Sequence, residues 1–241
     1  MVRRFKQIWV MVLQMAFPFV SPVAGEPLLL VTEEYPPMNY RGPDGVVTGR
    51  ATELLRVVAA KAGIEYEIRV LPWKRAYHMA LHDKGVCVYS TWRTEEREKL
   101  FQWIGPLALD AWSFFARKEQ RLEIGSLTDT FQYNVGAVEG WGVTQYLVEQ
   151  GHPSLDKVAK DDTTNLRKLL LGRIDLWVTG RIIAEELLAK QQIRSVEEVY
   201  FLREVELSVA CNIHNDPDKM KRLQFTLDLV RQEQAGEASP N

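Results

Sequence analysis

Hydrophobic and polar positions along residues 28–90 change their period in a regular order. Apolar side chains between residues 51 and 62 recur at offsets of 3, 4, 7, 8 and 11 from Ala51, which places them on one helix face. Thr48 can cap the start of that helix and Gly63 can end it. The predicted elements are strands at 28–32, 66–71 and 86–90 and helices at 51–62 and 74–83. This order predicts a parallel α/β unit.

The same alternation returns in the second half of the chain. Thr163 can cap a helix with leucines at helical spacing, and Asp216-Pro217 suits the start of a last helix. The predicted elements are strands at 133–138, 174–178 and 207–211 and helices at about 142–149, 163–170, 181–190 and 217–230. The polar end is expected to fray from Glu233, and residues 236–241 are assigned to a tail.

The first 25 residues have the layout of a secretory signal peptide. Basic residues Arg3, Arg4 and Lys6 precede a mostly apolar stretch at 8–20, and small residues follow at 21–25. The alternative is a membrane anchor. The apolar stretch has 13 residues, however, and a transmembrane helix needs roughly 20. We therefore expect residues 1–25 to be cleaved and the mature protein to be soluble in the periplasm.

The overall composition is that of a globular protein. The chain has 241 residues, of which 46% are hydrophobic and 26% charged. There are 30 Lys and Arg residues against 32 Asp and Glu residues, so the net charge is -2 and no basic excess favours nucleic acid as a partner. The length suits one large domain or two lobes of roughly 100 residues.

The cysteines and histidines suggest no metal site. Cys87 and Cys211 lie in apolar, strand-like runs, and they can form a disulfide in an oxidising compartment or stay as two buried thiols. His78 and His82 are four residues apart, but no third ligand accompanies them, so a solvated helix face is the better interpretation. We expect neither a metal nor a cofactor.

Five stretches, in order, carry a resemblance to a known family. They are Tyr35 to Tyr40 with Gly45 to Gly49, Leu71 to Ala76, Thr94 to Arg97 with Phe101 to Pro106, Asn134 to Gly140, and Leu170 to Asp175. Together the chain resembles bacterial extracellular solute-binding proteins of family 3, the polar amino acid type. The resemblance implies the α/β type II periplasmic-binding-protein fold, in which two crossover strands join two lobes around a ligand cleft. It places lobe 1 at 28–106 plus 208–235 and lobe 2 at 112–204.

The resemblance also implies ligand contacts in the first lobe. Tyr35 and Trp73 match the aromatic walls of the family, although both could be core aromatics. Arg97 matches the arginine that clamps a ligand carboxylate, and a surface ion pair is its alternative role. We expect Arg97 to be exposed in the cleft behind a short helix, so that its loss changes stability little. Ser90 and Trp92 match backbone and hydroxyl contacts, with Trp92 in place of the usual Thr.

In the second lobe, the family pattern is less complete. Gly140 and Trp141 would present backbone N–H groups at a helix start, or they form a plain turn. Glu139 could face a cationic group. The acid that receives a ligand α-ammonium in amino acid binders is replaced by Gly180, and Thr179 before it remains a candidate contact. Either the ligand lacks the ammonium, or Glu33, Glu34 or Glu139 substitutes for the missing acid.

The resemblance favours a monomeric, non-enzymatic protein that delivers a small polar solute, amino-acid-like or carboxylate-bearing, to the membrane permease of an ABC importer. One alternative is an enzyme on the same fold, of the cyclic acid dehydratase type, with Glu139 as the best acid–base candidate. Another is a ligand-sensing module whose partner is a separate receptor. The sequence does not identify the ligand.

Overall fold

The computed structural model describes residues 26–237. Its centre is one sheet of eight strands in the order β4-β1-β5-β10-β6-β9-β7-β8, and β2 and β3 form a separate hairpin. The strands are β1 (Leu28–Thr32), β2 (Tyr40–Arg41), β3 (Val47–Thr48), β4 (Tyr66–Val70), β5 (Val86–Arg93), β6 (Phe101–Arg117), β7 (Val135–Gly136), β8 (Leu155–Asp156), β9 (Leu176–Gly180) and β10 (Val196–Asn212). The helices are α1 (Arg50–Ala62), α2 (Trp73–His82), α3 (Gly142–Glu149), α4 (Asp162–Leu170), α5 (Arg181–Lys190) and α6 (Pro217–Glu237).

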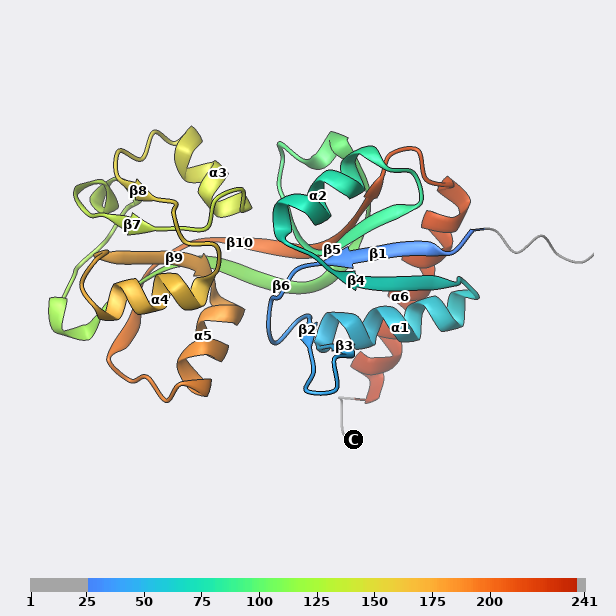
Figure 1. Ribbon diagram of the computed structural model, residues 1–241, viewed down its shortest axis with the longest axis horizontal. Helices are drawn as coiled ribbons and strands as arrows, with labels where there is room; N and C mark the ends of the chain where they lie inside the picture. The colour runs from blue at the N-terminus through green and yellow to red at the C-terminus, as the bar shows by residue number, and fades with distance from the viewer. Residues whose placement is uncertain (1–25, 238–241) are drawn as a thin grey trace, which may run out of the picture.

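One end of the sheet forms the body that we call lobe 1. Strands β4, β1 and β5 are parallel there, as the sequence predicted. Helices α1 and α6 cover one face and α2 covers the other (Figure 1). The residue that precedes helix α1 as its N-cap is Gly49, not the predicted Thr48. Gly49 has a φ of 118°, which glycine adopts readily, and the chain turns there into the helix. Gly63 ends the helix in the left-handed conformation, with φ 61°.

The other end of the sheet, lobe 2, repeats the architecture. Strands β8, β7 and β9 are parallel, and α3, α4 and α5 pack around them (Figure 1). The cap predicted for α4 was wrong by two residues. The carboxylate of Asp161, not the hydroxyl of Thr163, caps the helix by accepting a hydrogen bond from Thr164 N at 2.7 Å. Ionised Asp is the stronger acceptor and also suits the positive end of a helix.

Two long antiparallel strands join the lobes. β6 and β10 have 17 residues each and run through both ends of the sheet (Figure 1). In lobe 1, β10 pairs with β5, and in lobe 2, β6 pairs with β9. The lobe boundaries predicted between 106 and 112 and between 204 and 208 fall inside these two strands. The type II periplasmic binding fold expected from the family resemblance is confirmed.

The C-terminal helix is longer than predicted. α6 continues to Glu237, past Glu233, where fraying was expected. It packs on α1 and β6, and Lys61 of α1 holds Glu233 at 2.5 Å. This ion pair joins the end of α6 to the body of lobe 1.

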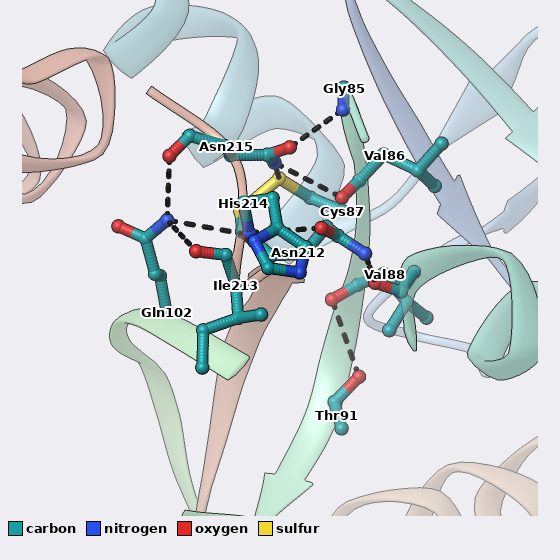
Figure 2. Close-up of a disulfide and its surroundings, with 12 residues drawn as sticks. Gly85, Val86, Cys87, Val88, Thr91, Gln102, Asn212, Ile213, His214 and Asn215 are labelled. Carbon is teal, nitrogen blue, oxygen red and sulfur yellow. Dashed lines mark hydrogen bonds between the residues drawn. A yellow bond between two sulfur atoms is a disulfide. The ribbon is translucent and has the colours of Figure 1, made fainter. Parts of the chain in front are cut away.

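A disulfide closes the base of lobe 1. Cys87 on β5 and Cys211 on β10 are direct partners in the antiparallel register, with Cα atoms 3.9 Å apart, and their sulfur atoms are bonded. Figure 2 shows the surrounding hydrogen bonds, in which Asn215 accepts from Gly85 N at 2.6 Å and donates to Val86 O at 3.2 Å. Of the two alternatives for the cysteines, the disulfide is the one the structure contains.

The signal peptide predicted at 1–25 lies outside the described residues. Within residues 26–237, no helix combines the length and apolar character required to cross a bilayer.

Candidate functional site

A cavity of about 680 Å³ lies between the two lobes. Lobe 1 contributes Glu33 and Trp73 to its lining, and lobe 2 contributes Trp141 and Asp162. Its volume falls in the range of small-molecule sites, roughly 300–1,000 Å³. The two lobes therefore build this site jointly.

A second, smaller space continues inward from the first. It is lined by Glu33, Tyr35, Trp73, Ser90, Trp92, Arg97, Trp141 and Gly142. The centre of a water molecule can occupy about 10 Å³ of this space, so the space is large enough for roughly one water. Six of the nine predicted ligand contacts thus line one small chamber. Glu33, Trp73 and Trp141 line both spaces and connect them.

Aromatic rings form the wall between the lobes. Tyr35 and Trp92 of lobe 1 both meet Trp141 of lobe 2 edge-on, with ring centroids 5.6 and 5.4 Å away. Tyr35 is only 3% exposed, and its hydroxyl donates to Asp110 Oδ2 at 3.3 Å. Of the two predicted walls, Tyr35 is thus mostly a packing residue, whereas Trp73 is half-buried and faces both spaces.

Arg97 is not the exposed cleft arginine that the sequence predicted. It is 2% exposed, and the turn at Thr94 leads only into a short 3₁₀ segment at Glu98–Leu100. Its guanidinium donates to Gly140 O at 3.1 Å and to Gln145 Oε1 at 2.7 Å, both in lobe 2. The guanidinium points toward lobe 2, where the oxygens of Gly140 and Gln145 accept its hydrogen bonds. Arg97 therefore ties the lobes together.

Four polar side-chain atoms of the residues that line the inner chamber have no hydrogen-bond partner within the described residues, and two of them belong to Arg97 and Ser90. The Nε atom of Arg97 and the Oγ atom of Ser90 make no hydrogen bond within the described residues. Ser90 also has a φ of 55°, a left-handed conformation that is rare for serine and is found disproportionately at functional sites. Both atoms are thus free to bond a molecule that enters the chamber.

The predicted contacts at the start of α3 lie differently from expectation. The backbone N–H of Trp141 is used inside the turn, where it donates to Val138 O at 3.3 Å. The carbonyl of Gly140 accepts from Trp73 Nε1 at 2.9 Å as well as from Arg97. Glu139 is exposed and pairs with Lys74 of lobe 1 at 2.5 Å. This turn is a lobe-to-lobe contact rather than an anion cradle.

Three carboxyl groups collect near the two spaces. Burial raises the pKa of Glu33 to about 8, the charge of Asp162 adds to the rise, and the nearby Trp141 indole and Arg97 oppose it. Burial also raises the pKa of Asp162 to about 7, although Thr179 and Trp177 donate to it. The pKa of Asp110 is raised by burial as well. The site interior therefore disfavours negative charge that has no cation beside it.

The family comparison covers most of the chain. Residues 28–186 match the model of the bacterial extracellular solute-binding proteins, family 3. The chain belongs to this family. The L-cystine-binding protein TcyJ of Escherichia coli (strain K12) is 25% identical over 158 residues, which are 65% of this chain. This match spans 59% of the length of that relative.

Solved structures share the family fold. A histidine kinase sensor domain with similarity to periplasmic binding proteins superposes with a TM-score of 0.81 at 19% identity and covers 89% of this chain and 94% of that one. An ancestral arginine-binding protein bound to arginine gives 0.74 at 19% identity, covering 86% and 92%. The GluR0 ligand-binding core from Nostoc punctiforme, in complex with L-glutamate, gives 0.74 at 21%, covering 86% and 94%.

In this family 3 protein, Gly180 stands where the sequence comparison expected an acid, and the side chains of Asp110 and Tyr35 occupy the space beside it. A Cβ atom built on Gly180 would lie 2.3 Å from Asp110 Oδ2 and 2.5 Å from the Tyr35 hydroxyl. Thr179, a predicted ligand contact, is fully buried and donates to Asp162 Oδ2 at 2.5 Å. Position 180 must therefore be glycine in this arrangement, and Thr179 holds an acid instead of a ligand.

Two of the three acids, Asp110 and Asp162, were not predicted from the sequence. Asp110 is a lone acid in the apolar run 107–116, a signal that could have marked it. Asp162 follows Asp161 directly, so it was indistinguishable from an ordinary acidic residue in the first turn of a helix. Glu33 was only one of three alternatives for the missing acid.

The histidine pair shows no sign of a metal site. His78 and His82 are exposed on α2 with ring centroids 4.3 Å apart. Across residues 26–237, no three His, Cys, Asp or Glu side chains gather closely enough to hold a metal ion.

Proposed function

We propose that this protein captures a small polar solute in the cleft and that both lobes contact it. One observation carries the proposal: the cavity of about 680 Å³ is lined from both lobes by indole faces and carboxyl groups. Indole faces provide contact area at low entropy cost, and buried polar groups select the solute. Membership of the solute-binding family supports the same conclusion.

The proposal includes the route of the solute. The protein is exported to the periplasm by the segment 1–25, and there it hands its solute to the membrane permease of an ABC importer. The basic–apolar–small order of that segment supports export. The name of the relative TcyJ, an L-cystine-binding protein, supports a small-solute role.

A sensory role is the second candidate. The solved structure with a TM-score of 0.81 is a histidine kinase sensor domain, which uses the same fold. Fold does not determine function, so this likeness makes the role worth testing without favouring it. Catalysis has less support: the bond from Lys74 lowers the pKa of Glu139, whereas a general acid at neutral pH needs a raised one.

Binding is tested by a thermal-shift array of amino acids, amines, carboxylates and neutral polar solutes, followed by calorimetry and mass spectrometry of any co-purified molecule. We expect at least one solute to raise the melting temperature. Trp73→Ala should weaken its binding, because Trp73 faces both spaces. Trp103→Ala is the matched control, since Trp103 lines neither space. If no solute binds, or if both variants bind like wild type, the cleft is not the site.

Delivery is tested separately in cells. A strain that lacks this chain should lose uptake of the solute that calorimetry identifies, and a plasmid copy should restore it. Uptake that continues unchanged in the deletion strain would contradict the importer role and favour the sensor.

A further inference from the structure

The two lobes contact each other directly along one edge of the cleft. Six residues make this contact, three of lobe 1 at the start of α2 or after β5 and three of lobe 2 in or just before α3: Trp73, Lys74, Arg97, Glu139, Gly140 and Gln145. In Figure 1, α2 and α3 lie on the upper side of the molecule. We call these six residues the α2–α3 edge.

The first two residues of α2 bond the turn that precedes α3. Trp73 Nε1 donates to Gly140 O at 2.9 Å, and Lys74 Nζ donates to Glu139 Oε2 at 2.5 Å. The fit is close, because a Cβ atom built on Gly140 would lie 3.6 Å from the Trp73 ring. Lys74 and Glu139 are exposed, so their ion pair alone is weak. Two adjacent residues of lobe 1 thus bond two adjacent residues of lobe 2.

Arg97 forms the buried part of this edge. Its Nη2 donates to Gly140 O at 3.1 Å and to Gln145 Oε1 at 2.7 Å, and the residue is 2% exposed. Hydrogen bonds from a charged donor are among the strong ones in proteins. The Nη1 atom donates to Trp92 O at 3.4 Å, which anchors the guanidinium on its own lobe. The edge therefore has a buried, charged contact behind an exposed ion pair.

Nonpolar contacts lie behind these bonds. Trp141, the residue after Gly140, meets Tyr35 and Trp92 of lobe 1 edge-on. A Cβ atom built on Gly142 would lie 3.4 Å from the methyl group of Thr94, so the start of α3 is in van der Waals contact with lobe 1. Such packing keeps water away from the buried hydrogen bonds and strengthens them.

The opposite edge of the cleft lacks such bonds. It lies between the β2–β3 hairpin and α5, on the lower side of Figure 1, and we call it the β2–α5 edge. The cavity of about 680 Å³ extends to it and is lined there by Tyr40 and Arg41 of lobe 1 and by Glu186 and Lys190 of lobe 2. Across the described residues, no hydrogen bond or ion pair joins residues 33–72 to residues 155–195. Arg41 instead donates to Val70 O of its own lobe at 2.9 Å.

The crossover strands provide the second connection between the lobes. β6 and β10 pair with each other and continue from one lobe into the other. The lobes are thus held together by these strands and by the α2–α3 edge. Opening the cleft at the α2–α3 edge breaks every bond described above, whereas the β2–α5 edge has no such bond to break.

None of these bonds runs through a solute. Every donor and acceptor that crosses the α2–α3 edge is a group of the protein. A ligand shifts a conformational equilibrium only as far as its affinities for the two states differ. Contacts that the protein makes with itself therefore hold this edge closed without help from a solute.

We propose that the α2–α3 edge is a latch that stays closed while the solute enters and leaves through the β2–α5 edge. The closed latch goes beyond the proposed function and does not depend on it. Only the route of the solute rests on the proposed function. The protein is then a pocket with one permanent opening and not a clamp that closes around its solute from both edges.

Spin labels across the α2–α3 edge test whether the latch is closed. Arg75→Cys on α2 and Val148→Cys on α3 provide exposed positions for the labels, and Cys87 and Cys211 do not react because they are bonded to each other. Any bound molecule is first removed by unfolding in urea, dialysis and refolding. We expect double electron–electron resonance to show one main distance, the one that the structure gives. A mainly longer or broad distribution would overturn the latch.

Variants then assign the closed state to the bonds. The latch variant removes one donor, one charge and one acceptor through Trp73→Phe, Glu139→Gln and Gln145→Ala. Together these losses should raise the ratio of separated to joined molecules at least about 20-fold, seen as a second, longer distance. The matched control removes the same kinds of bond from within single lobes, through Trp103→Phe, Glu67→Gln and Gln132→Ala. If the latch variant is folded by circular dichroism and keeps the wild-type distances, these bonds do not hold the lobes and the proposal is wrong.

The route of the solute is tested with a latch that cannot open. Lys74→Cys and Glu139→Cys, both at exposed positions, are joined by a short bismaleimide, and the same variant capped with N-ethylmaleimide is the control. Each solute of the thermal-shift array that binds the wild type is measured by stopped flow. We expect its association rate to agree within about threefold between the two forms. Association that is abolished or at least about tenfold slower in the cross-linked form would show that the solute needs this edge to open.

The outcomes separate the latch from the proposed function. If solutes bind but the lobes are separated without them, the proposed function stands and the latch is wrong. If no solute of the array binds the wild type, the proposed function and the route through the β2–α5 edge are contradicted together. The spin-label distances still decide in that case whether the latch is closed.

Discussion

Removal of Arg97 should destabilise the protein, although a cleft arginine would be expected to matter little for folding. The side chain is 2% exposed and donates to Trp92 O at 3.4 Å, to Gly140 O at 3.1 Å and to Gln145 Oε1 at 2.7 Å. Its guanidinium also lies over the Trp73 ring at 5.5 Å. Arg97→Ala removes all of these contacts, including the bond that joins lobe 1 to Gln145 of lobe 2.

The magnitude follows from these contacts. Charge-assisted hydrogen bonds contribute about 1.5–3 kcal/mol each, and the cost of desolvating the guanidinium cancels part of the sum. The 3.4 Å bond is weak, and Gly140 O keeps its bond from Trp73. We therefore expect Arg97→Ala to lower the free energy of unfolding by about 2–4 kcal/mol. Arg97→Lys should recover less than half, since one ammonium cannot reach acceptors in both directions.

Urea unfolding followed by circular dichroism measures this loss. Arg69→Ala is the control, because Arg69 is an exposed residue paired with Glu67, and exposed pairs contribute at most about 1 kcal/mol. If Arg97→Ala lost less than about 0.5 kcal/mol, the contacts of Arg97 with lobe 2 would not persist in solution. The lobe-to-lobe role assigned to it would then be wrong.

Three further predictions concern other parts of the molecule. Gly180→Ala should cost about 1–3 kcal/mol in urea unfolding, because its Cβ would lie 2.3 Å from a carboxylate oxygen, and near-wild-type stability would show that the pocket relaxes. The double substitution Cys87→Ser with Cys211→Ser should lower the free energy of unfolding by about 2–5 kcal/mol relative to the oxidised protein. Equal melting temperatures of the variant and the oxidised protein would contradict this prediction. Glu33 and Asp162 have pKa values of about 8 and 7, raised from 4.5 and 3.8, so the folded protein binds protons more tightly than the unfolded chain. Stability without solute should therefore fall as pH rises from about 4 to about 8, and Glu33→Gln should flatten that slope in melts.

The sequence predicted the elements of the fold well where local signals agree. Helix α5 was expected at 181–190 and is found at Arg181–Lys190, because its hydrophobic period and its flanking residues agree. β6 was not predicted as a 17-residue strand. Its length arises from pairing with β10 and β9, which lie far away in the sequence, and no local pattern reveals such a partner.

Candidate site residues were easier to locate than to interpret. The family resemblance pointed to Arg97, Ser90 and Trp92, and these side chains do line the inner space. The partners of Arg97 could not be predicted, because Gly140 and Gln145 reach it only through the arrangement of the two lobes. The raised pKa of Glu33 could not be predicted either, because it results from burial, and the sequence alone does not show which acids are buried.

The disulfide has a consequence for the covalent integrity of the molecule. Cys87 and Cys211 are 124 positions apart, and all of lobe 2 lies in the loop that their bond closes. A protease that cut once anywhere in lobe 2 would produce two fragments that stay linked through lobe 1. Such a nicked molecule would migrate as one species on a gel without reductant and as two with it. After a single cut in lobe 2, both halves of the cleft would thus stay together in one covalently linked molecule.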